Sequence, residues 1–544
     1  MIRPDWRPGG WSRRLALALS GGALMGLSMP GLGPGSLAYI ALVPLLLAIH
    51  GAPPRQAFLL GLAGGFLSFA ISMSWVAETI HTFGGLPWLL AEPVCWLLAA
   101  WMGLFVALFT AGTRLIDAHT RIPLAIAAPP LWVVLEYLRA HLLTGLPWNL
   151  LGLAAHEQVR MIQIADVGGI YAVSWYVATV GACLYALLLP LFDTTRGYRQ
   201  AHYFNHGLVL FLLPVCVAAY GQVRIAALSL HHQQNPDPAG PIRVALVQPN
   251  IPQEVKWNPE ALDGIMQRLA RQTTQAALLE PDLIVWPEAS APLVLDYSPR
   301  YQNMVRQLAV GAGTHLLVGS LSPVLERLNP ATRNSAYLFG PNGRLVDLAA
   351  KEHLVPFGEY VPLERLLPFV RRLTQGIGDL VPGSGGAVLE HPRGSAGLAV
   401  CYELIFPDLV RRRFADGADF LVTITNDAWF GTSAAPAQHF ANGVFRAVEN
   451  RAYVVRAANT GISGMVDPYG IVQARSELNT EAVVAASIHH RADTSFYTRH
   501  GDRFAWLCVL LSAAALLRAA ARARQRAPRP AEADHGDDGD EADD

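Results

Sequence analysis

One cysteine in the polar half of the chain has the setting of a nucleophile. Four of the five cysteines lie inside long apolar segments, and only Cys401 lies among charged residues, in the stretch LAVCYELIFPD (398–408). A thiol has a pKa of about 8.5, so it becomes a ready nucleophile only when a base or a cation lies nearby. Cys401 is therefore either an inert buried side chain or a thiol retained for chemistry.

Two further ionisable side chains follow apolar segments in the same way. Glu288 comes after IVWP, and Lys351 comes after a predicted hairpin, in LAAKEHLVPFGEY. A carboxylate beside Cys401 can take the thiol proton and later deprotonate an incoming amine. A lysine can stabilise the oxyanion of a tetrahedral intermediate, with a backbone N–H after Cys401 as the second donor. Each of the two is by itself more commonly a solvated loop charge, and sequence separation does not show that the three meet.

The segments that end in these residues are predicted to be buried strands. They are short and apolar, polar residues stand at their ends, and helical stretches separate most of them. This alternation predicts an α/β layered fold, in which chemistry collects where strands end. Asn342-Gly343 indicates a hairpin turn within 336–349. The predicted strands are 244–250, 283–290, 315–321, 398–404 and 420–427, and the clearest predicted helices are 261–279 and 439–454.

The composition divides the chain into a membrane part and a soluble part. Of the 544 residues 52% are apolar and 15% are charged, against about 25% charged in a typical soluble protein. Lys and Asp are nearly missing from the first 230 residues, whereas residues 241–490 have ordinary globular composition. The net charge of −1 argues against nucleic acid as a partner. The predicted units are a membrane domain (1–230), a catalytic domain (241–490), a C-terminal span (500–522) and a basic, then acidic, disordered tail (523–544).

About eight spans are expected, since roughly 20 mostly apolar residues cross a bilayer. The first two are short and are also compatible with one bent hairpin, and a signal peptide is the rival interpretation of the first. The predicted spans are 15–32, 35–50, 57–78, 87–112, 122–140, 169–192, 205–227 and 504–520.

Arginines in alternate short loops predict the orientation of the spans. Basic residues precede the first span and recur in every second loop, as in Arg55 and Arg114, which places the N-terminus in the cytoplasm. The catalytic domain would then lie on the outer side, and the eighth span would return the C-terminus to the cytoplasm.

The connection between the fifth and sixth spans carries polar and aromatic residues near the membrane. Glu136 is expected to face the protein interior, where it can pair with Arg139. Trp148 suits a position at the membrane interface. The segment 363–373 is either a lipid-facing arm or a plain amphipathic surface helix, and the Asn426-Asp427 turn is expected to support the neighbourhood of the nucleophile.

Four motifs in order resemble those of the nitrilase, or carbon-nitrogen hydrolase, superfamily. They are WPEAS, KEHLVPFGEY, CYELIFPD and TNDAWFG, and they lie within residues 243–488. The resemblance implies a four-layered αββα sandwich with a catalytic triad of Glu288 as proton acceptor, Lys351 for oxyanion stabilisation and Cys401 as nucleophile.

The spans around this domain, with the segment VQPNIPQEVKW, resemble the bacterial apolipoprotein N-acyltransferase branch of that superfamily. On this resemblance Trp257, Glu359, Tyr402 and Glu403 are supporting or substrate-binding positions. It implies transfer of an acyl chain from a membrane phospholipid, through a Cys401 thioester, to the N-terminal α-amine of a diacylglyceryl-modified apolipoprotein. The enzyme would lie in the bacterial inner membrane, with its catalytic domain in the periplasm.

Two other functions compete with acyl transfer. A membrane-anchored amidase would use the same triad to hydrolyse a small amide with water, and a lipid-binding scaffold would carry an inactive hydrolase fold. The eight predicted spans favour the acyltransferase over the amidase, and the intact Glu288, Lys351 and Cys401 argue against the scaffold. The histidines show no metal-ligand spacing, so neither a metal nor a cofactor is expected.

Overall fold

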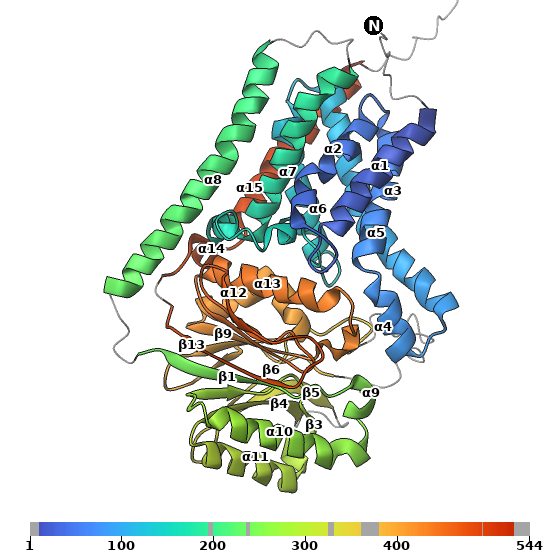
Figure 1. Ribbon diagram of the computed structural model, residues 1–544. Coiled ribbons are helices and arrows are strands. Elements are labelled where there is room, and N and C mark those ends of the chain that lie inside the picture. Colours follow the sequence, from blue (N-terminus) through green and yellow to red (C-terminus); the bar gives the residue numbers. More distant parts are fainter. Residues whose placement is uncertain are drawn as a thin grey trace, which may run out of the picture.

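The computed structural model describes residues 10–193, 200–234, 240–324, 331–360, 380–491 and 493–526. A bundle of helices forms one end of the molecule, and an α/β sandwich forms the other (Figure 1). Each of the eight predicted spans coincides with a helix. These helices are α1 (Gly10–Leu27), α2 (Ala38–Ile49), α3 (Pro54–Ser72), α5 (Trp88–His119), α6 (Leu124–His141), α7 (Ala165–Phe192), α8 (Gln200–Gln234) and α15 (Arg503–Arg526), and the short α4 (Trp75–Gly84) lies between α3 and α5.

Five helices of the described ranges are long and apolar enough to cross a membrane, by length and composition: α3, α5, α7, α8 and α15. The apolar segment Gly35–Ile49, which contains α2, is shorter. The protein is therefore a multi-pass membrane protein, whereas the full count of eight spans stays a prediction. Helix α15 continues to Arg526, so residues 523–526, predicted as part of a disordered tail, are helical. Residues 527–544 and the predicted arm 363–373 lie outside the described residues.

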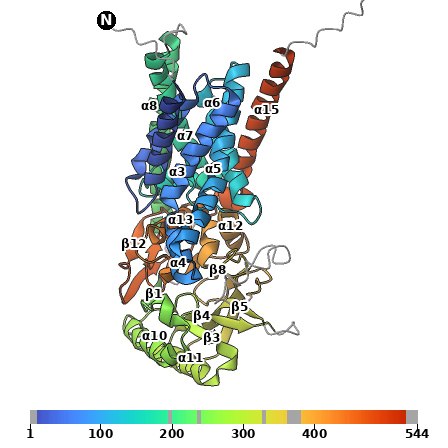
Figure 2. The ribbon, with the colours of Figure 1, turned by 90° about the vertical axis from the view of Figure 1, so that its right-hand side faces the viewer.

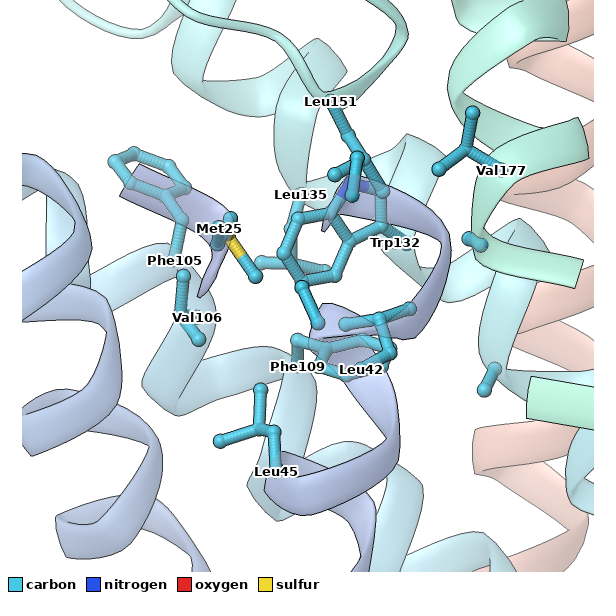
Figure 3. Packing of buried hydrophobic residues seen from close by; sticks show 14 of the residues in the cluster. Met25, Leu42, Leu45, Phe105, Val106, Phe109, Trp132, Leu135, Leu151 and Val177 are labelled. Atoms are coloured by element: carbon cyan, nitrogen blue, oxygen red, sulfur yellow. The ribbon is translucent and has the colours of Figure 1, made fainter. Parts of the chain in front are cut away.

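The bundle packs closely because glycines lie where helices cross. A side chain on Gly22 of α1 would collide with the backbone of Gly64 in α3, so only glycine allows this approach, a common device in membrane helix packing. Elsewhere in the bundle, large apolar side chains fill the space between the helices (Figure 3). Phe109 and Trp132 meet edge to face, with ring centroids 4.9 Å apart.

Two mixed sheets packed face to face form the sandwich. The first has the strand order β13-β1-β2-β4-β5-β6 with β3 beside β4, and the second has the order β12-β11-β10-β9-β8-β7. Their strands are β1 (Ile242–Gln248), β2 (Leu283–Val285), β3 (Ala291–Val294), β4 (His315–Pro323), β5 (Thr332–Phe339), β6 (Leu345–Ala350), β7 (Val388–Leu389), β8 (Ala396–Val400), β9 (Phe420–Thr425), β10 (Val454–Ala458), β11 (Gly464–Val466), β12 (Val472–Arg475) and β13 (Ala482–Ile488).

Alternation along the strands divides the core into layers. In β1, Val244 and Leu246 point between the two sheets, whereas Ala245 and Val247 point toward the outer helices, as the two-residue period of a strand requires. Helices α10 (Leu262–Ala277) and α11 (Pro299–Ala312) cover the first sheet, and α12 (Pro407–Ala415) and α13 (Ala435–Asn450) cover the second. The order of layers is αββα, as predicted.

Helices α12 and α13 also meet the helical bundle. We call this contact between the bundle and the α12/α13 layer the helix–sandwich interface. One apolar cluster joins Val133 and Ile170 of the bundle to Phe445 and Val448 of α13. Because α13 is covered by a sheet on one side and by the bundle on the other, nearly all of its residues are buried.

The connection between α6 and α7 keeps its polar side chains inside the protein. Trp148 is buried, and its indole N–H donates to Gln438 Oε1 of α13 at 2.8 Å, while its predicted depth at the membrane interface stays a prediction. Glu136 faces the interior as expected but accepts the N–H of Leu151, while Arg139 donates to the carbonyl oxygens of Leu146 and Trp148. Both charges therefore hold this buried loop, whose backbone groups need partners away from water.

Several predicted boundaries also shift. The strand predicted over 283–290 stops at Val285, and the chain then turns, with the N–H of Ser290 donating to the carbonyl oxygen of Pro287. The strand predicted through residue 404 stops at Val400, and Cys401–Ile405 form a 3₁₀ helix. The helix predicted over 439–454 spans Ala435–Asn450 instead.

Candidate active site

Three strand ends from both sheets bring the predicted triad to one place. Glu288 follows β2 and Lys351 follows β6, both in the first sheet, while Cys401 follows β8 in the second. All three are buried, with 6%, 1% and 9% of their surfaces exposed. The sheets pack face to face, so strand ends separated in sequence by 50 residues and more converge.

Lys351 is the cation of the site. Its Nζ lies 2.8 Å from Glu359 Oε1 and 3.6 Å from Glu288 Oε1. Burial alone would lower the pKa of Lys351, but the two carboxylates outweigh burial and raise it. Lys351 therefore stays charged at neutral pH, as a stabiliser of negative charge must.

Both carboxylate oxygens of Glu288 are held by donors. The side-chain amide of Asn334 donates to Oε1 at 2.6 Å, and the backbone N–H of Asn426 donates to Oε2 at 2.8 Å. Asn334 lies in β5 and Asn426 follows β9, so each sheet supplies one donor. These bonds fix the orientation of the carboxylate relative to Lys351.

Cys401 occupies a sharp turn between β8 and the 3₁₀ helix. Its φ is +53°, in the left-handed region that residues other than glycine rarely adopt. Backbone strain of this kind is commonly found at functional sites. The peptide groups around it are held: the N–H of Val400 donates to Glu403 Oε2 at 2.7 Å, and His439 Nε2 lies 3.0 Å from the carbonyl oxygen of Cys401.

The electrostatic surroundings keep the Cys401 thiol protonated until a base acts. Burial raises the pKa of the thiol, the negative charge of Glu288 raises it further, and the positive charge of Lys351 opposes both. The thiol is thus within electrostatic reach of Glu288 and Lys351. A proton that leaves the sulfur can pass to the Glu288 carboxylate, after which the thiolate faces a lysine cation.

Three of the four supporting positions lie at the centre. Glu359 contacts Lys351, and its Oε2 also accepts the N–H of Val355. Glu403 bridges two strand ends, since its Oε1 accepts the backbone N–H groups of Glu352 and His353 while Oε2 accepts that of Val400.

Tyr402 reaches the helical bundle, where its hydroxyl donates to the carbonyl oxygen of Gly145 at 3.1 Å. Trp257, by contrast, is 42% exposed at the end of the short helix α9 (Gln253–Lys256). Within the described ranges no hydrogen bond connects Trp257 with the triad.

The neighbour of Trp257 is a site residue that sequence reasoning missed. Lys256 is buried, and its Nζ donates to the carbonyl oxygen of Glu288 at 2.9 Å. Burial lowers the pKa of Lys256 to about 8, although the negative charges of Glu288 and Cys401 act to raise it. A lysine in the polar segment QEVKW gives no sign of this burial, which depends on how α9 docks beside β2.

A buried charged cluster behind Cys401 was also not predicted. His439 Nδ1 lies 3.0 Å from Asp427 Oδ1, and Arg456 contacts Asp427 Oδ2 at 2.5 Å. Burial would raise the pKa of Asp427, but Arg456 and His439 outweigh burial and lower it. The Asn426-Asp427 turn was expected to support the neighbourhood of the nucleophile, and the Asp427 carboxylate does so by holding the histidine that contacts the carbonyl oxygen of Cys401. No group of three or more His, Cys, Asp or Glu suited to a metal occurs in the described part of the chain.

Comparison with known proteins agrees with this fold. Residues 243–494 match the carbon-nitrogen hydrolase family model, and residues 21–183 match the model of the apolipoprotein N-acyltransferase N-terminal domain. The sandwich therefore defines a carbon-nitrogen hydrolase, or nitrilase-like, enzyme fold. Among solved structures, the nitrilase-superfamily protein Nit3 of Saccharomyces cerevisiae is 23% identical, with 46% of this chain and 90% of that chain covered and a TM-score of 0.34.

Full-length relatives narrow the class to one family. The apolipoprotein N-acyltransferase of Geobacter metallireducens is 40% identical over 91% of this chain and 93% of its own length. That of Azotobacter vinelandii is 33% identical over 98% of both chains. The chain belongs to the apolipoprotein N-acyltransferase family.

Proposed function

We propose that the protein transfers an acyl chain from a membrane phospholipid to the N-terminal α-amine of a diacylglyceryl-modified apolipoprotein, in two steps through a Cys401 thioester. The observation that carries this proposal is the buried Glu288–Lys351–Cys401 centre at strand ends next to a membrane bundle. Both substrates are held in a bilayer, so a nucleophile for them must be anchored near its surface.

In the first step Glu288 accepts the thiol proton, and the Cys401 thiolate attacks the carbonyl carbon of an acyl ester. Lys351 and the backbone N–H of Tyr402 stabilise the oxyanion of the tetrahedral intermediate. When the intermediate collapses, the C–O ester bond breaks and Glu288 returns the proton to the leaving alkoxide. The products are an acyl thioester on Cys401 and a lysophospholipid.

In the second step the lipoprotein α-amine attacks the thioester carbonyl. Glu288 takes a proton from the attacking nitrogen, and Lys351 again stabilises the oxyanion. Breakage of the C–S bond releases the amide-linked, triacylated lipoprotein, and the sulfur recovers its proton from Glu288. The cycle is ping-pong and uses no cofactor.

We further propose that the N- and C-termini face the bacterial cytoplasm and that the sandwich lies on the periplasmic side. Two observations support this orientation. The start of α1 and the end of α15 both lie at the end of the bundle opposite the sandwich (Figure 2). Arg14 and Arg114, two of the arginines used to orient the spans, donate to carbonyl oxygens of the same turn, at Ala48 and Ala52, so the basic residues collect at that end.

The test is the intact mass of the purified protein after incubation with a phospholipid, without acceptor. Wild type should gain one acyl chain, removable by hydroxylamine, and Cys401→Ala should gain none. Cys216→Ala is the matched control, because Cys216 is an exposed cysteine on α8 and should leave the adduct intact. Addition of a diacylglyceryl-cysteine peptide should then clear the adduct and acylate the peptide.

Other outcomes point to the competing functions. An adduct that water clears, with no acylated peptide, would support a hydrolase. An adduct that persists in Cys401→Ala would contradict the assignment of the nucleophile.

A further inference from the structure

A small cavity inside the helical bundle is separate from the catalytic centre, since the triad contributes no residue to it. Its walls come from α1, α3, α5, α6 and the connection that follows α6, and Figure 3 labels Trp132 and Leu151 among its lining residues. Most of the lining is apolar. The polar side chains that matter below are those of Ser72, Trp132, Glu136 and Asn149.

Four polar atoms of these side chains are buried without a hydrogen bond in the described part of the chain. They are Ser72 Oγ, Trp132 Nε1, Glu136 Oε2 and Asn149 Oδ1, and the four residues are between 2% and 6% exposed. Buried polar groups are almost always paired, and surrounding lipid offers them no partner. Four such atoms on the walls of one cavity therefore indicate a polar ligand inside it.

The remaining polar atoms of Glu136 and Asn149 already have neighbours in the protein. Glu136 Oε1 accepts the N–H of Leu151 at 2.6 Å. The side-chain nitrogen of Asn149 faces two acceptors, the carbonyl oxygen of Ser72 at 3.4 Å and Gln438 Oε1 at 3.5 Å. This nitrogen therefore faces the protein, and Asn149 Oδ1 is the atom left for a ligand.

Trp132 and Glu136 are close to each other but do not bond directly. The Trp132 indole and the Ser174 hydroxyl both lie near the Glu136 carboxylate, yet the indole N–H forms no hydrogen bond of ordinary geometry. Polar groups that lie near each other without a direct bond are commonly bridged by a water molecule. The Trp132 and Glu136 pair has this arrangement.

The four unpaired atoms define the chemistry of the ligand. The hydroxyl of Ser72 and the N–H of Trp132 can donate to it, whereas Glu136 Oε2 and Asn149 Oδ1 can accept from it. A ligand that accepts two hydrogen bonds and donates two satisfies all four atoms, and water does so. A metal cation offers no acceptor to the indole N–H, and a simple anion donates nothing to the carboxylate.

The size of the cavity also matches water. The space open to a water molecule is about 20 Å³, and one water needs about 10–15 Å³ on the same measure. A larger polar ligand would not fit. Arg139, the other charged residue of the lining, donates to the carbonyl oxygens of Leu146 and Trp148, so its guanidinium is already bound by the protein.

The polar cavity lies next to the contacts that fix α13 on the bundle. Ser72 is the last residue of α3, and its carbonyl oxygen accepts from Gln438 Nε2 at 3.0 Å. Gln438 precedes His439, whose Nε2 lies 3.0 Å from the carbonyl oxygen of Cys401. A ligand between Ser72, Glu136 and Asn149 would hold together the surface on which α13 rests.

We infer that this cavity binds one internal water molecule, which accepts hydrogen bonds from Ser72 and Trp132 and donates to Glu136 and Asn149. The water joins α3, α6 and the connection between α6 and α7, three segments whose polar groups lipid cannot satisfy. The inference does not depend on the proposed acyl transfer, and its tests measure no acyl transfer.

The first test is a crystal structure of the full wild-type chain at a resolution that shows other buried waters. One water should lie within hydrogen-bond distance of Ser72 Oγ, Trp132 Nε1, Glu136 Oε2 and Asn149 Oδ1. Other buried waters without one at this place would overturn the inference. An anomalous signal at this place in crystals soaked in a rubidium salt would overturn it in favour of a monovalent cation.

The second test compares the removal of two buried hydroxyls. Ser512 on α15 is 4% exposed, has no hydrogen bond within the described ranges and does not line the cavity. Removing a hydroxyl without a partner should not weaken a protein, whereas removing one bound to water loses a hydrogen bond. In mixed SDS micelles Ser72→Ala should raise the equilibrium constant of unfolding about fivefold, and Ser512→Ala should leave it unchanged or lower it. Equal behaviour of the two variants would contradict the water site.

Discussion

The catalytic centre and the helix–sandwich interface both bury charged side chains, but they pair the charges differently. At the interface Arg446 meets one carboxylate, that of Glu449, with Nε and Oε2 2.8 Å apart. Glu449 also accepts the backbone N–H of Ile170 in α7 at 2.8 Å. In the centre Lys351 is shared between two carboxylates, those of Glu359 and Glu288.

The difference shows how one protein uses buried charge for stability in one region and for reactivity in another. Burial raises the pKa of Glu449 to about 7 although Arg446 opposes this, but no thiol lies beside the pair, and removing the cation leaves a buried carboxylate without its partner. A second carboxylate beside a lysine and a thiol can accept a proton and release it again. Four variants test this contrast, and their expected effects decrease from Glu288→Gln to Lys256→Met.

Glu288→Gln should slow catalysis and leave stability nearly unchanged. The amide keeps the size of the side chain but cannot take the Cys401 proton, so thioester formation should slow by about 10² to 10⁴, while the thermal unfolding midpoint changes little. Intact mass against time gives the rate. Glu280→Gln, at an exposed carboxylate before β2, is the control. A normal rate in Glu288→Gln would remove Glu288 as the base.

Arg446→Met should lower stability and leave catalysis nearly unchanged. It leaves Glu449 buried without its cation partner, which should cost about 3–5 kcal/mol of folding free energy. Thermal unfolding in detergent micelles measures this loss, and the acylation rate per folded molecule should stay close to wild type. Arg300→Gln, on the far face of the sandwich, should cost less than about 1 kcal/mol. A slow but fully stable Arg446→Met would contradict the division of roles.

His439 lies at the border between the catalytic centre and the helix–sandwich interface. Its ring is 5.7 Å from that of Trp148 in the interface, and its Nε2 contacts the carbonyl oxygen of Cys401. His439→Phe keeps the ring contact but loses the donor, so kcat for acylation should fall about tenfold with KM for the phospholipid unchanged. His439→Gln, which retains a donor, should recover part of the rate. Equal losses in both variants would indicate a packing role only.

Lys256→Met should have the smallest effect, and one that depends on pH. Because the pKa of Lys256 is lowered to about 8, the lysine is charged below that pH and favours the Cys401 thiolate there. Iodoacetamide should therefore modify Cys401 in Lys256→Met about fivefold more slowly below pH 8, and the two proteins should converge above it. A difference that persists at high pH would show that Lys256 acts through packing.

Stability provides a second check with a definite sign. The unfolded chain keeps Lys256 protonated up to its ordinary pKa of 10.5, whereas the folded chain releases the proton near pH 8. Between about pH 8 and pH 10.5 the unfolded state therefore binds more protons than the folded state. The contribution of Lys256 to the free energy of unfolding consequently rises with pH over this range. Lys256→Met should lack this rise relative to wild type.

Local sequence patterns were enough to predict most elements and the residues capable of the chemistry. Apolar runs predicted each of the bundle helices that correspond to spans, and short apolar strands with polar ends placed Glu288, Lys351 and Cys401 where an α/β sheet exposes side chains. These features depend on local periodicity and on the order of residues along one element, so they can be read from neighbouring positions.

The residues that surround the nucleophile, by contrast, depend on how distant elements pack together. Asn334, Lys256 and His439 reach the centre from three separate elements, and their sequence neighbourhoods resemble ordinary solvated or core segments. Trp257 was predicted and Lys256 was not, although they are adjacent, because the docking of α9 buries one and exposes the other. Such choices arise from packing between two sheets and a helical bundle, which residue spacing along a single element does not encode.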